Sequence, residues 1–272
     1  MIPAPFEYEV AESVEHASEL LGSNPDAKLL AGGHSLLPAM RLRIARPSLL
    51  VDVGRLRDLS YVREDGDQIA IGALTRHHDV QHDALLQAHC GLLSYTAGLV
   101  GDPQVRHRGT IGGSVAHGDP ASDLPTALLA LDAEFVVQGP GGRRTVAAGD
   151  FFVGVFETAL GPQDVLTEIR VPKLAGGYAY VKFNRRAQDW ATVGVAAARV
   201  DGGVHVGLTS MGATPLRAGA VEQALAGGAD PAGAAEHAAE GTDPPSDTNG
   251  SAEYRRELAK VLVRRALEQT LA

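Results

Sequence analysis

Two short glycine-rich segments constrain this chain more than any other feature of its sequence. They are Ala31-Gly32-Gly33-His34-Ser35 and Thr110-Ile111-Gly112-Gly113-Ser114. Glycine tolerates positive φ and lets a ligand come close to the backbone. A concave row of backbone N–H groups, helped by a serine hydroxyl, can therefore neutralise a phosphate without a lysine or arginine. One segment suits a monophosphate, whereas two segments that face each other from different structural units suit a diphosphate.

The surroundings of both segments favour this interpretation over a pair of ordinary turns. The first follows an apolar run at 28–31 and precedes a helical pattern at 36–43. That order adds the positive end of a helix dipole to the turn. The second lies in a long stretch, 101–125, that is rich in Gly, Pro, Asp and Ser, and long irregular stretches in compact domains are usually functional. Within it, Asp123 is a suitable acceptor for ribose hydroxyls, and it should lie on the nucleoside side because it would repel a phosphate.

Composition excludes several classes of protein. With 272 residues and a hydrophobic fraction of 44%, the chain can form one large domain or two to three small ones. A net charge of −9 argues against a nucleic-acid partner. No stretch approaches the ~20 apolar residues of a transmembrane helix, and the first residues lack a secretory signal, so we expect a cytoplasmic protein. The single cysteine, Cys90, excludes an internal disulfide, a thiolate zinc site and an iron–sulfur cluster in this chain, and we expect it in the core.

The pattern along the chain predicts an α+β fold in three parts. Residues 1–55 read as a βαβαβ unit, with strands at 6–10, 28–31 and 49–53 and helices at 13–21 and 36–43. Residues 56–175 carry predicted strands at 61–63, 69–72, 134–138, 143–147 and 165–171, and helices at 75–82, 85–99 and 123–131. A break at 172–177 predicts a domain boundary. The remainder, 176–272, has three predicted strands at 178–184, 193–200 and 204–211, the last two joined by a hairpin, and helices at 216–226, 231–240 and 252–271.

The chain resembles a known family in these segments. The runs 31–38 and 101–125, together with three later signatures at 167–172, 189–196 and 250–256, are similar to the FAD-binding medium subunit of molybdenum hydroxylases, of the carbon monoxide dehydrogenase and xanthine dehydrogenase type. The resemblance extends from end to end. It implies a two-lobed PCMH-type FAD-binding domain at 1–175, with subdomains at about 1–55 and 56–175, followed by a C-terminal domain at 176–272 with a three-stranded antiparallel sheet plus helices.

The resemblance also implies a cofactor site. The sequence lacks both the Gly-x-Gly-x-x-Gly fingerprint and the P-loop, so FAD would have to use other loops. By the resemblance, both glycine segments hold the diphosphate, Asp123 lies at the adenosine side, and Lys182 places a cation near the flavin ring. The full set of implied cofactor residues is Leu29, Leu30, Ala31, Gly32, Gly33, His34, Ser35, Leu36, Thr110, Ile111, Gly112, Gly113, Ser114, Asp123, Leu166, Lys182 and Trp190.

Several of these assignments have plainer alternatives. Lys182 could be an exposed strand lysine, and Trp190 could equally be a core residue. His34 should pack in its loop and donate a hydrogen bond to the cofactor.

Other polar residues favour structural roles. His77, His78 and His82 have a helical spacing that could hold zinc, but no convincing third ligand completes the set, so we predict a solvated helix and no metal site. On the last predicted helix we expect the basic residues, Arg255 among them, to form a solvated face. No serine or cysteine nucleophile with a base can be identified, and we predict no catalytic residues in the acid–base sense.

The predicted function is that of an oxidoreductase subunit. By the resemblance, FAD on this chain takes electrons from a [2Fe–2S] small subunit, which receives them from a molybdopterin-binding large subunit, and passes them to an external acceptor such as a quinone, NAD or oxygen. The three chains would form a heterotrimer that can dimerise. Two alternatives remain open: a free-standing flavoprotein oxidoreductase that acts directly on a small substrate, and a nucleotide-responsive binding protein without a redox role.

Overall fold

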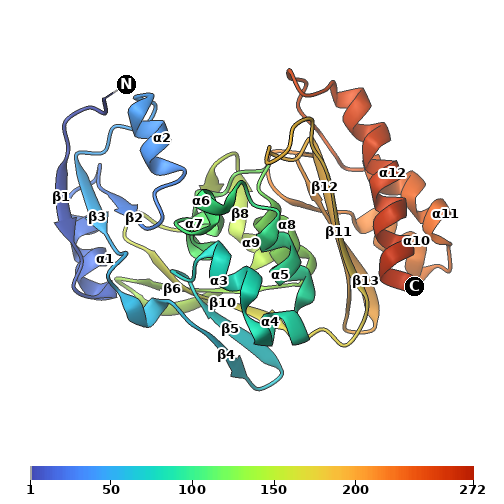
Figure 1. Ribbon diagram of the computed structural model, residues 1–272, viewed down its shortest axis with the longest axis horizontal. Coiled ribbons are helices and arrows are strands. Elements are labelled where there is room, and N and C mark those ends of the chain that lie inside the picture. The colour runs from blue at the N-terminus through green and yellow to red at the C-terminus, as the bar shows by residue number, and fades with distance from the viewer. Residues whose placement is uncertain (1) are drawn as a thin grey trace.

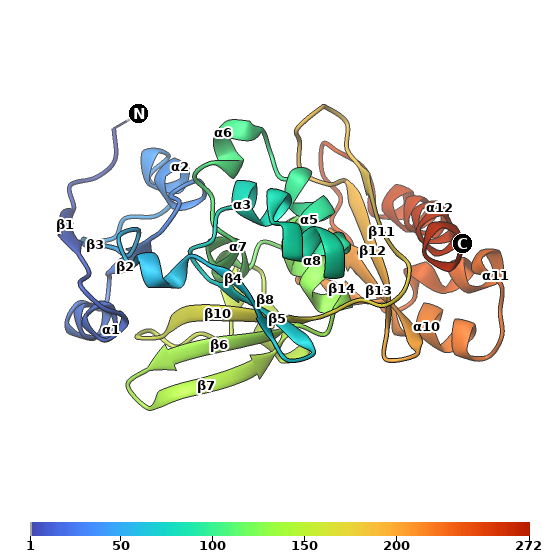
Figure 2. The same cartoon turned by 60° about the horizontal axis from the view of Figure 1, so that its bottom comes forward.

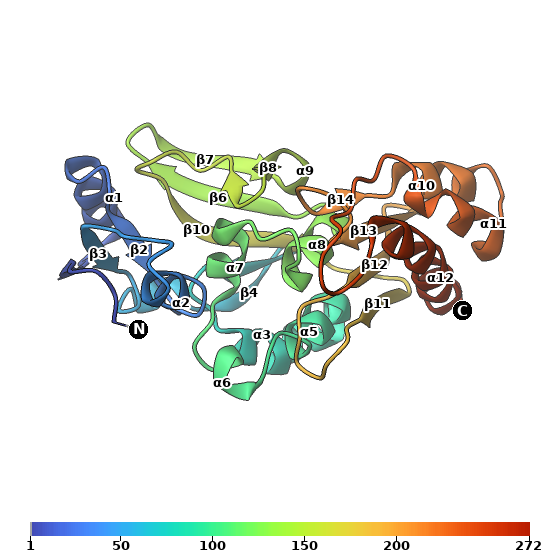
Figure 3. The same ribbon diagram turned by 90° about the horizontal axis from the view of Figure 1, so that it is seen from above.

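The three larger of four β-sheets lie in a row along the long axis of the computed structural model, which describes residues 2–272 (Figure 1). The N-terminal sheet lies at one end, the central sheet and its helices in the middle, and the C-terminal sheet and its helices at the other end. The same succession is seen in the two turned views (Figures 2 and 3). Within the described residues, no helix has the length and apolar character needed to cross a membrane.

The N-terminal sheet is the predicted βαβαβ unit. Its strands pair in parallel in the order β1-β3-β2, and the side chain of Ser13 accepts a hydrogen bond from the His16 N–H at the start of the first helix. Neighbouring parallel strands have to be joined by crossover connections, and the helices α1 and α2 supply these connections. The elements are β1 (Glu7–Val10), α1 (Val14–Ser23), β2 (Lys28–Leu30), α2 (Leu36–Arg41) and β3 (Leu49–Asp52).

The central sheet is antiparallel, in the order β4-β5-β10-β6-β7. Alternate residues of its strands, including Ile71, Phe135 and Ile169, belong to one buried core with residues of the central helices. The strands are β4 (Val62–Asp65), β5 (Gln68–Gly72), β6 (Glu134–Gly139), β7 (Gly142–Ala147) and β10 (Val165–Pro172), with a small pair β8 (Phe152–Gly154) and β9 (Glu157–Thr158). The helices are η1 (Arg57–Leu59), α3 (His77–His82), α4 (Ala84–His89), α5 (Gly91–Gly98), α6 (Pro103–Arg106), α7 (Ile111–His117), α8 (Asp123–Ala130) and α9 (Ala148–Phe151).

Two sequence predictions for the central part were wrong. The helix expected at 85–99 is divided into α4 and α5 at Cys90, whose φ of −148° and ψ of 53° are not helical. Cys90 is nevertheless buried in the core as predicted, and burial raises the pKa of its thiol to about 12. The second glycine segment is not an open loop, because Thr110 caps α7 and residues 111–114 form the first turn of that helix.

The C-terminal sheet has four strands rather than the three predicted. Residues Leu216–Arg217, expected to start a helix, instead form a short edge strand paired with β13, and the helix begins at Gly219. The elements are β11 (Tyr178–Phe183), β12 (Val193–Val200), β13 (Gly203–Thr209), β14 (Leu216–Arg217), α10 (Gly219–Ala226), α11 (Pro231–Ala235), η2 (Glu236–Ala239) and α12 (Ala252–Leu271).

This sheet is covered on both faces, which joins it to the rest of the protein. Tyr180 and Ala196 belong to the central core, whereas Val195 and Leu262 belong to a second core between the sheet and α10–α12 (Figure 1). The prediction that Arg255 lies on a solvated face was wrong. Its side chain is buried on α12 and donates to the backbone oxygen of Thr192 and, over 2.8 Å, to Asp247 Oδ1.

Candidate functional site

The first glycine segment forms a tight turn between β2 and α2, as predicted. Gly33 has a φ of +79°, a backbone conformation that L side chains rarely adopt, and its carbonyl accepts from the Leu37 N–H over 3.0 Å. Among residues 2–272, the N–H groups of Gly32, Gly33, His34 and Ser35 donate to no other group of the chain, and the Ser35 hydroxyl makes no capping bond. The turn therefore offers a short series of backbone donors beside a serine hydroxyl.

The second glycine segment has most of its donors engaged already. Gly113 N–H donates to Thr110 Oγ1 over 3.1 Å, Ile111 N–H to the Thr75 oxygen over 3.0 Å, and Gly112 N–H to the Ala73 oxygen over 2.9 Å. A Cβ on Gly112 would lie 2.5 Å from Ala73 Cβ, so this glycine allows α7 to pack closely on the chain that follows β5. The segment thus presents a helix start and hydroxyl groups instead of a second open row of amides.

The fold brings the two segments together. A Cβ on Gly32 would lie 2.3 Å from the carbonyl oxygen of Arg108 and 2.7 Å from Gly109 Cα, immediately before Thr110. Only glycine permits this approach of the two backbones. The expectation that the segments face each other is therefore supported by direct contact between their flanking residues.

A buried histidine supports this junction, although the sequence suggested a solvated helix. His77 is 5% exposed, its N–H donates to the Gly109 oxygen over 3.0 Å, and a Cβ on Gly109 would lie 2.7 Å from its ring. Burial, with smaller contributions from His34 and Arg106, lowers the pKa of His77 from 6.5 to about 4. Its Nδ1 atom is buried without a hydrogen-bond partner among the described residues. Residues 2–272 contain no group of three His, Cys, Asp or Glu side chains placed to hold a metal ion.

Because His77 is neutral in the fold and ionises more readily in the unfolded chain, it should make the protein less stable in acid. Its contribution to stability is complete above pH 6.5 and is lost as the pH falls from 6.5 to 4, and the total loss over this range is about 3 kcal/mol. We therefore expect His77→Gln to flatten the unfolding free energy over this range in urea titrations at several pH values. The exposed-histidine variant His89→Gln serves as control and should keep the wild-type slope. An unchanged slope in His77→Gln would contradict the assignment.

The predicted residues Asp123 and Lys182 meet in a buried ion pair between α8 of the central part and β11 of the C-terminal sheet. Lys182 Nζ lies 2.8 Å from Asp123 Oδ2 and 3.3 Å from the Leu99 oxygen, and the two charged side chains are 8% and 5% exposed. Tyr180 donates to Asp123 Oδ1 over 2.8 Å. Burial raises the pKa of Asp123, and the ammonium of Lys182 opposes that rise. The alternative of an exposed strand lysine is therefore wrong.

This arrangement bears on the expected contact of Asp123 with ribose. Both carboxylate oxygens accept hydrogen bonds from the chain, and the residue is 4% exposed. Each oxygen keeps a lone pair that could accept from a ribose hydroxyl, but the hydroxyl would have to reach a side chain that is almost fully buried, so the ribose contact remains a prediction. The network continues through Thr209 Oγ1, which lies 3.1 Å from the Tyr180 hydroxyl, to Thr126. Next to Asp123, the hydroxyl of Ser122 lies 2.9 Å from that of Ser114, so the ion pair adjoins the second glycine segment.

Tyr180 was not predicted from the sequence, although a signal for it exists. It lies two residues before Lys182 on β11, and residues two apart on a strand share a face of the sheet. Any function assigned to Lys182 therefore implicates Tyr180. His77 had no comparable signal, because its burial depends on the contact with Gly109.

The remaining predicted residues differ in exposure. Leu166 on β10 is 7% exposed and belongs to the central core. Trp190, in the connection between β11 and β12, is 55% exposed, so a core role is wrong. His34 is exposed, and Leu29, Leu30, Ala31 and Leu36 are half-buried. Their contacts with a cofactor remain predictions.

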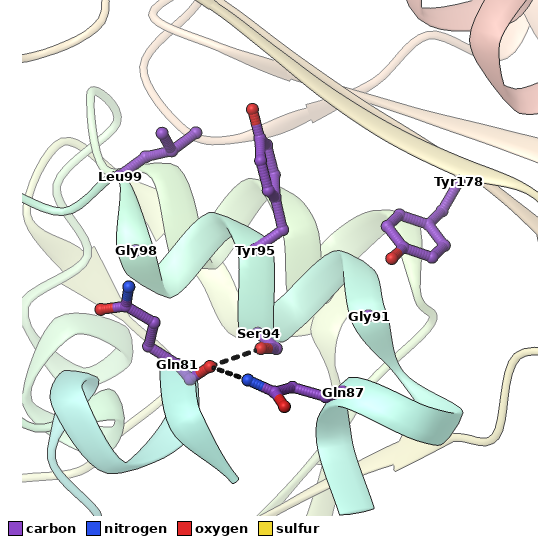
Figure 4. Close-up of a pocket in the computed structure, with 8 residues that line it drawn as sticks. All are labelled: Gln81, Gln87, Gly91, Ser94, Tyr95, Gly98, Leu99 and Tyr178. Carbon is purple, nitrogen blue, oxygen red and sulfur yellow. Dashed lines mark hydrogen bonds between the residues drawn. The ribbon is translucent and has the colours of Figure 1, made fainter. Parts of the chain in front are cut away.

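A separate pocket of about 420 Å³ lies between α3, α4, α5 and β11 (Figure 4). Its walls include Tyr95 and Tyr178, and the Ser94 hydroxyl and Gln87 amide both donate to the Gln81 backbone oxygen. None of the predicted cofactor residues lines it. It adjoins the ion pair only through Leu99, whose carbonyl accepts from Lys182.

The residues present fit a flavin dinucleotide. The free amides of the first turn suit a phosphate, and the glycine contact at Gly32 holds that turn against the second segment. The buried pair of Asp123 and Lys182 adjoins the second segment through Ser122 and supplies an oriented dipole whose positive end is the Lys182 ammonium.

Comparison with known proteins identifies the class. Residues 4–174 match the family described as FAD binding domain in molybdopterin dehydrogenase, and residues 178–270 match the CO dehydrogenase flavoprotein C-terminal domain. The chain therefore belongs to the family of FAD-binding flavoprotein chains of molybdopterin dehydrogenases.

Individual relatives agree over the whole length. The chain is 43% identical to the carbon monoxide dehydrogenase medium chain of Hydrogenophaga pseudoflava, with 100% of this chain and 99% of the relative covered. It is 38% identical to the 6-hydroxypseudooxynicotine dehydrogenase complex subunit alpha of Paenarthrobacter nicotinovorans, covering 100% and 96%. A solved structure of carbon monoxide dehydrogenase from Hydrogenophaga pseudoflava superposes with a TM-score of 0.96 at 46% identity, covering 100% and 99%.

Proposed function

We propose that this chain is the FAD-carrying electron-transfer subunit of a molybdenum hydroxylase. FAD held by this chain would supply electron transfer between a [2Fe–2S] subunit and an external acceptor, and substrate oxidation would take place on a molybdopterin-binding subunit. The observation that carries the proposal is the contact of the two glycine segments at Gly32, beside a turn with free backbone donors. The family membership supports the same conclusion.

The residues of this chain bind and orient the cofactor. We assign Leu29–Leu36 and Thr110–Ser114 to the diphosphate. Because Lys182 and Asp123 lie 2.8 Å apart, both belong at the same end of the cofactor, and we assign the pair to the flavin end in place of the adenosine side expected for Asp123. A preorganised positive charge near the ring favours the negative charge that accompanies reduction. We assign residues 1–175 to the FAD-binding domain, 176–272 to the C-terminal domain, and the whole complex to the cytoplasm.

The substrate of the complex is not encoded in this chain. The two relatives above belong to dehydrogenases of carbon monoxide and of a nicotine derivative, as their names state, yet this chain aligns with both from end to end. Substrate choice therefore belongs to the molybdopterin chain.

Co-expression with a molybdopterin-binding chain and a [2Fe–2S] chain of the same kind of complex tests the proposal. We expect a yellow complex whose flavin absorbance is bleached by substrate only when the [2Fe–2S] chain is present. Bleaching of this chain alone by a small substrate would support the free-standing oxidoreductase instead. A colourless chain that does not bind added FAD would contradict both.

A further inference from the structure

Tyr180 contacts the buried ion pair of Asp123 and Lys182 from within the C-terminal sheet. Its hydroxyl donates to Asp123 Oδ1 over 2.8 Å, while Lys182 Nζ lies 2.8 Å from Asp123 Oδ2. The tyrosine is 4% exposed, and burial raises the pKa of its phenol well above the ordinary value, so the group keeps its proton and acts as a donor. Each carboxylate oxygen of Asp123 is therefore held by a different donor of the same strand, β11.

A glycine makes room for the Tyr180 hydroxyl. Gly194 on β12 pairs with Lys182 on one side and with Thr209 on the other, so these three residues form a row on one face of the sheet. A Cβ on Gly194 would lie 2.7 Å from the Tyr180 hydroxyl oxygen and 3.0 Å from Thr209 Oγ1. A larger residue at this position would therefore displace the hydroxyl from its place beside Asp123.

The helix that carries Asp123 is held against the same face of the sheet. α8 packs on β12 and β13 (Figure 1), and a Cβ on Gly207 of β13 would lie 2.7 Å from the backbone oxygen of Thr126. The Thr209 hydroxyl, 3.1 Å from that of Tyr180, donates to Thr126 Oγ1 over 2.7 Å. Because these contacts fix α8 on the sheet, the Tyr180 hydroxyl meets the Asp123 carboxylate in one defined orientation.

The hydrogen bond from Tyr180 changes how Asp123 acts on Lys182. A hydrogen bond to an ionised carboxylate places the positive end of the O–H dipole against the negative charge. Tyr180 thereby balances part of the carboxylate charge, and less of that charge offsets the ammonium of Lys182. We propose that Tyr180 is a positioning residue, which orients Asp123 and keeps the Lys182 ammonium electrostatically effective toward the flavin. This inference rests on the proposed function.

Tyr180→Phe in the full, FAD-loaded chain tests this inference, because the substitution removes only the hydroxyl. We expect unchanged FAD content and a reduction potential below that of the wild type, since the positive end of the O–H dipole is lost. Tyr178→Phe is the matched control. It removes the same group from the same face of β11, four residues from Lys182, and should leave the potential unchanged. Dye-coupled titration of the bound flavin measures both variants.

Gly194→Ala provides a second test, part of which does not depend on FAD. In the wild type the new Cβ would meet the Tyr180 hydroxyl, whereas in Tyr180→Phe that oxygen is absent. Gly194→Ala should therefore lower the urea midpoint of the full chain more in the wild type than in Tyr180→Phe. It should also lower the flavin potential only where the hydroxyl is present. Equal effects in both backgrounds would overturn the placement of the hydroxyl.

The remaining outcomes separate this inference from the proposed function. A wild-type potential in Tyr180→Phe, together with shifted potentials in Lys182→Met and Asp123→Asn, would overturn the role of Tyr180 alone, even if stability falls. A higher potential in Tyr180→Phe would also overturn it, because the charge of Asp123 would then have been lost. A wild-type chain that binds no FAD would overturn the proposed function together with this inference.

Discussion

Gly32→Val should give a folded but colourless protein. A side chain at this position would have its Cβ 2.3 Å from the Arg108 oxygen and 2.7 Å from Gly109 Cα, so the first turn would have to move away from the second segment. The donors of the turn would then no longer converge with Thr110 and Ser114 on one diphosphate. Loss of two charge-assisted hydrogen bonds, each worth about 1.5–3 kcal/mol, lowers FAD affinity by at least about 100-fold.

The measurement is FAD content after purification, together with FAD titration of the apoprotein followed by flavin fluorescence. Gly149→Val is the control, because a Cβ at Gly149 meets nothing within 4 Å and its φ is not positive. Gly112→Val is a second test and should also lose FAD. This variant should be less stable than the wild type as well, because the new Cβ would overlap Ala73. Wild-type FAD content in Gly32→Val would count decisively against the diphosphate assignment.

Lys182→Met should destabilise the protein by about 3–5 kcal/mol, because it leaves the buried carboxylate of Asp123 without its cation. Burial already raises the pKa of Asp123, and removal of the ammonium should raise it further. A carboxyl group whose pKa is higher in the folded than in the unfolded state binds its proton more tightly when the protein is folded. The variant should therefore lose stability as the pH rises above 3.8, the ordinary pKa of Asp. Urea unfolding between acidic and neutral pH measures this trend.

A matched lysine variant distinguishes a lost buried pair from the loss of any lysine. Lys173 pairs with exposed Glu64 over 3.4 Å, and Lys173→Met should change stability by no more than about 1 kcal/mol. The double variant Asp123→Asn/Lys182→Met should recover part of the loss, because no unpaired charge remains buried. Equal losses in Lys182→Met and Lys173→Met would contradict the importance of the buried pair.

The same pair should set the flavin reduction potential. Lys182→Met removes a positive charge and should lower the reduction potential, because the negative charge of the reduced flavin loses a stabilising partner. Asp123→Asn removes a negative charge and should raise the potential. Opposite shifts measured by dye-coupled titration would support the proposed position of the pair near the flavin. Unchanged potentials in both variants would place the pair away from the ring.

Much of the fold followed from local patterns. The βαβαβ unit, most central strands and the hairpin of β12 and β13 follow from the alternation and spacing of apolar residues and from turn signals such as Asp201-Gly202-Gly203. The short strand β14 could not be predicted, because its strand character comes from pairing with β13 and not from its own residues. The end of α4 at Cys90 had one local signal, Gly91 directly after it, and the prediction of one continuous helix over 85–99 overlooked it.

The sequence by itself indicated two glycine segments suited to a diphosphate, because glycine at close backbone approaches is a local requirement that few other residues satisfy. FAD was implied by the family resemblance of these segments. Only the tertiary structure decided that the first segment keeps its amides free while those of the second are mostly engaged. The pairing of Asp123 with Lys182 and the burial of Arg255 and His77 were also visible only in the tertiary structure. The physical reason is that burial and charge pairing depend on neighbours that are distant in the sequence, and the energy of each contact is set by the surroundings that the complete fold creates.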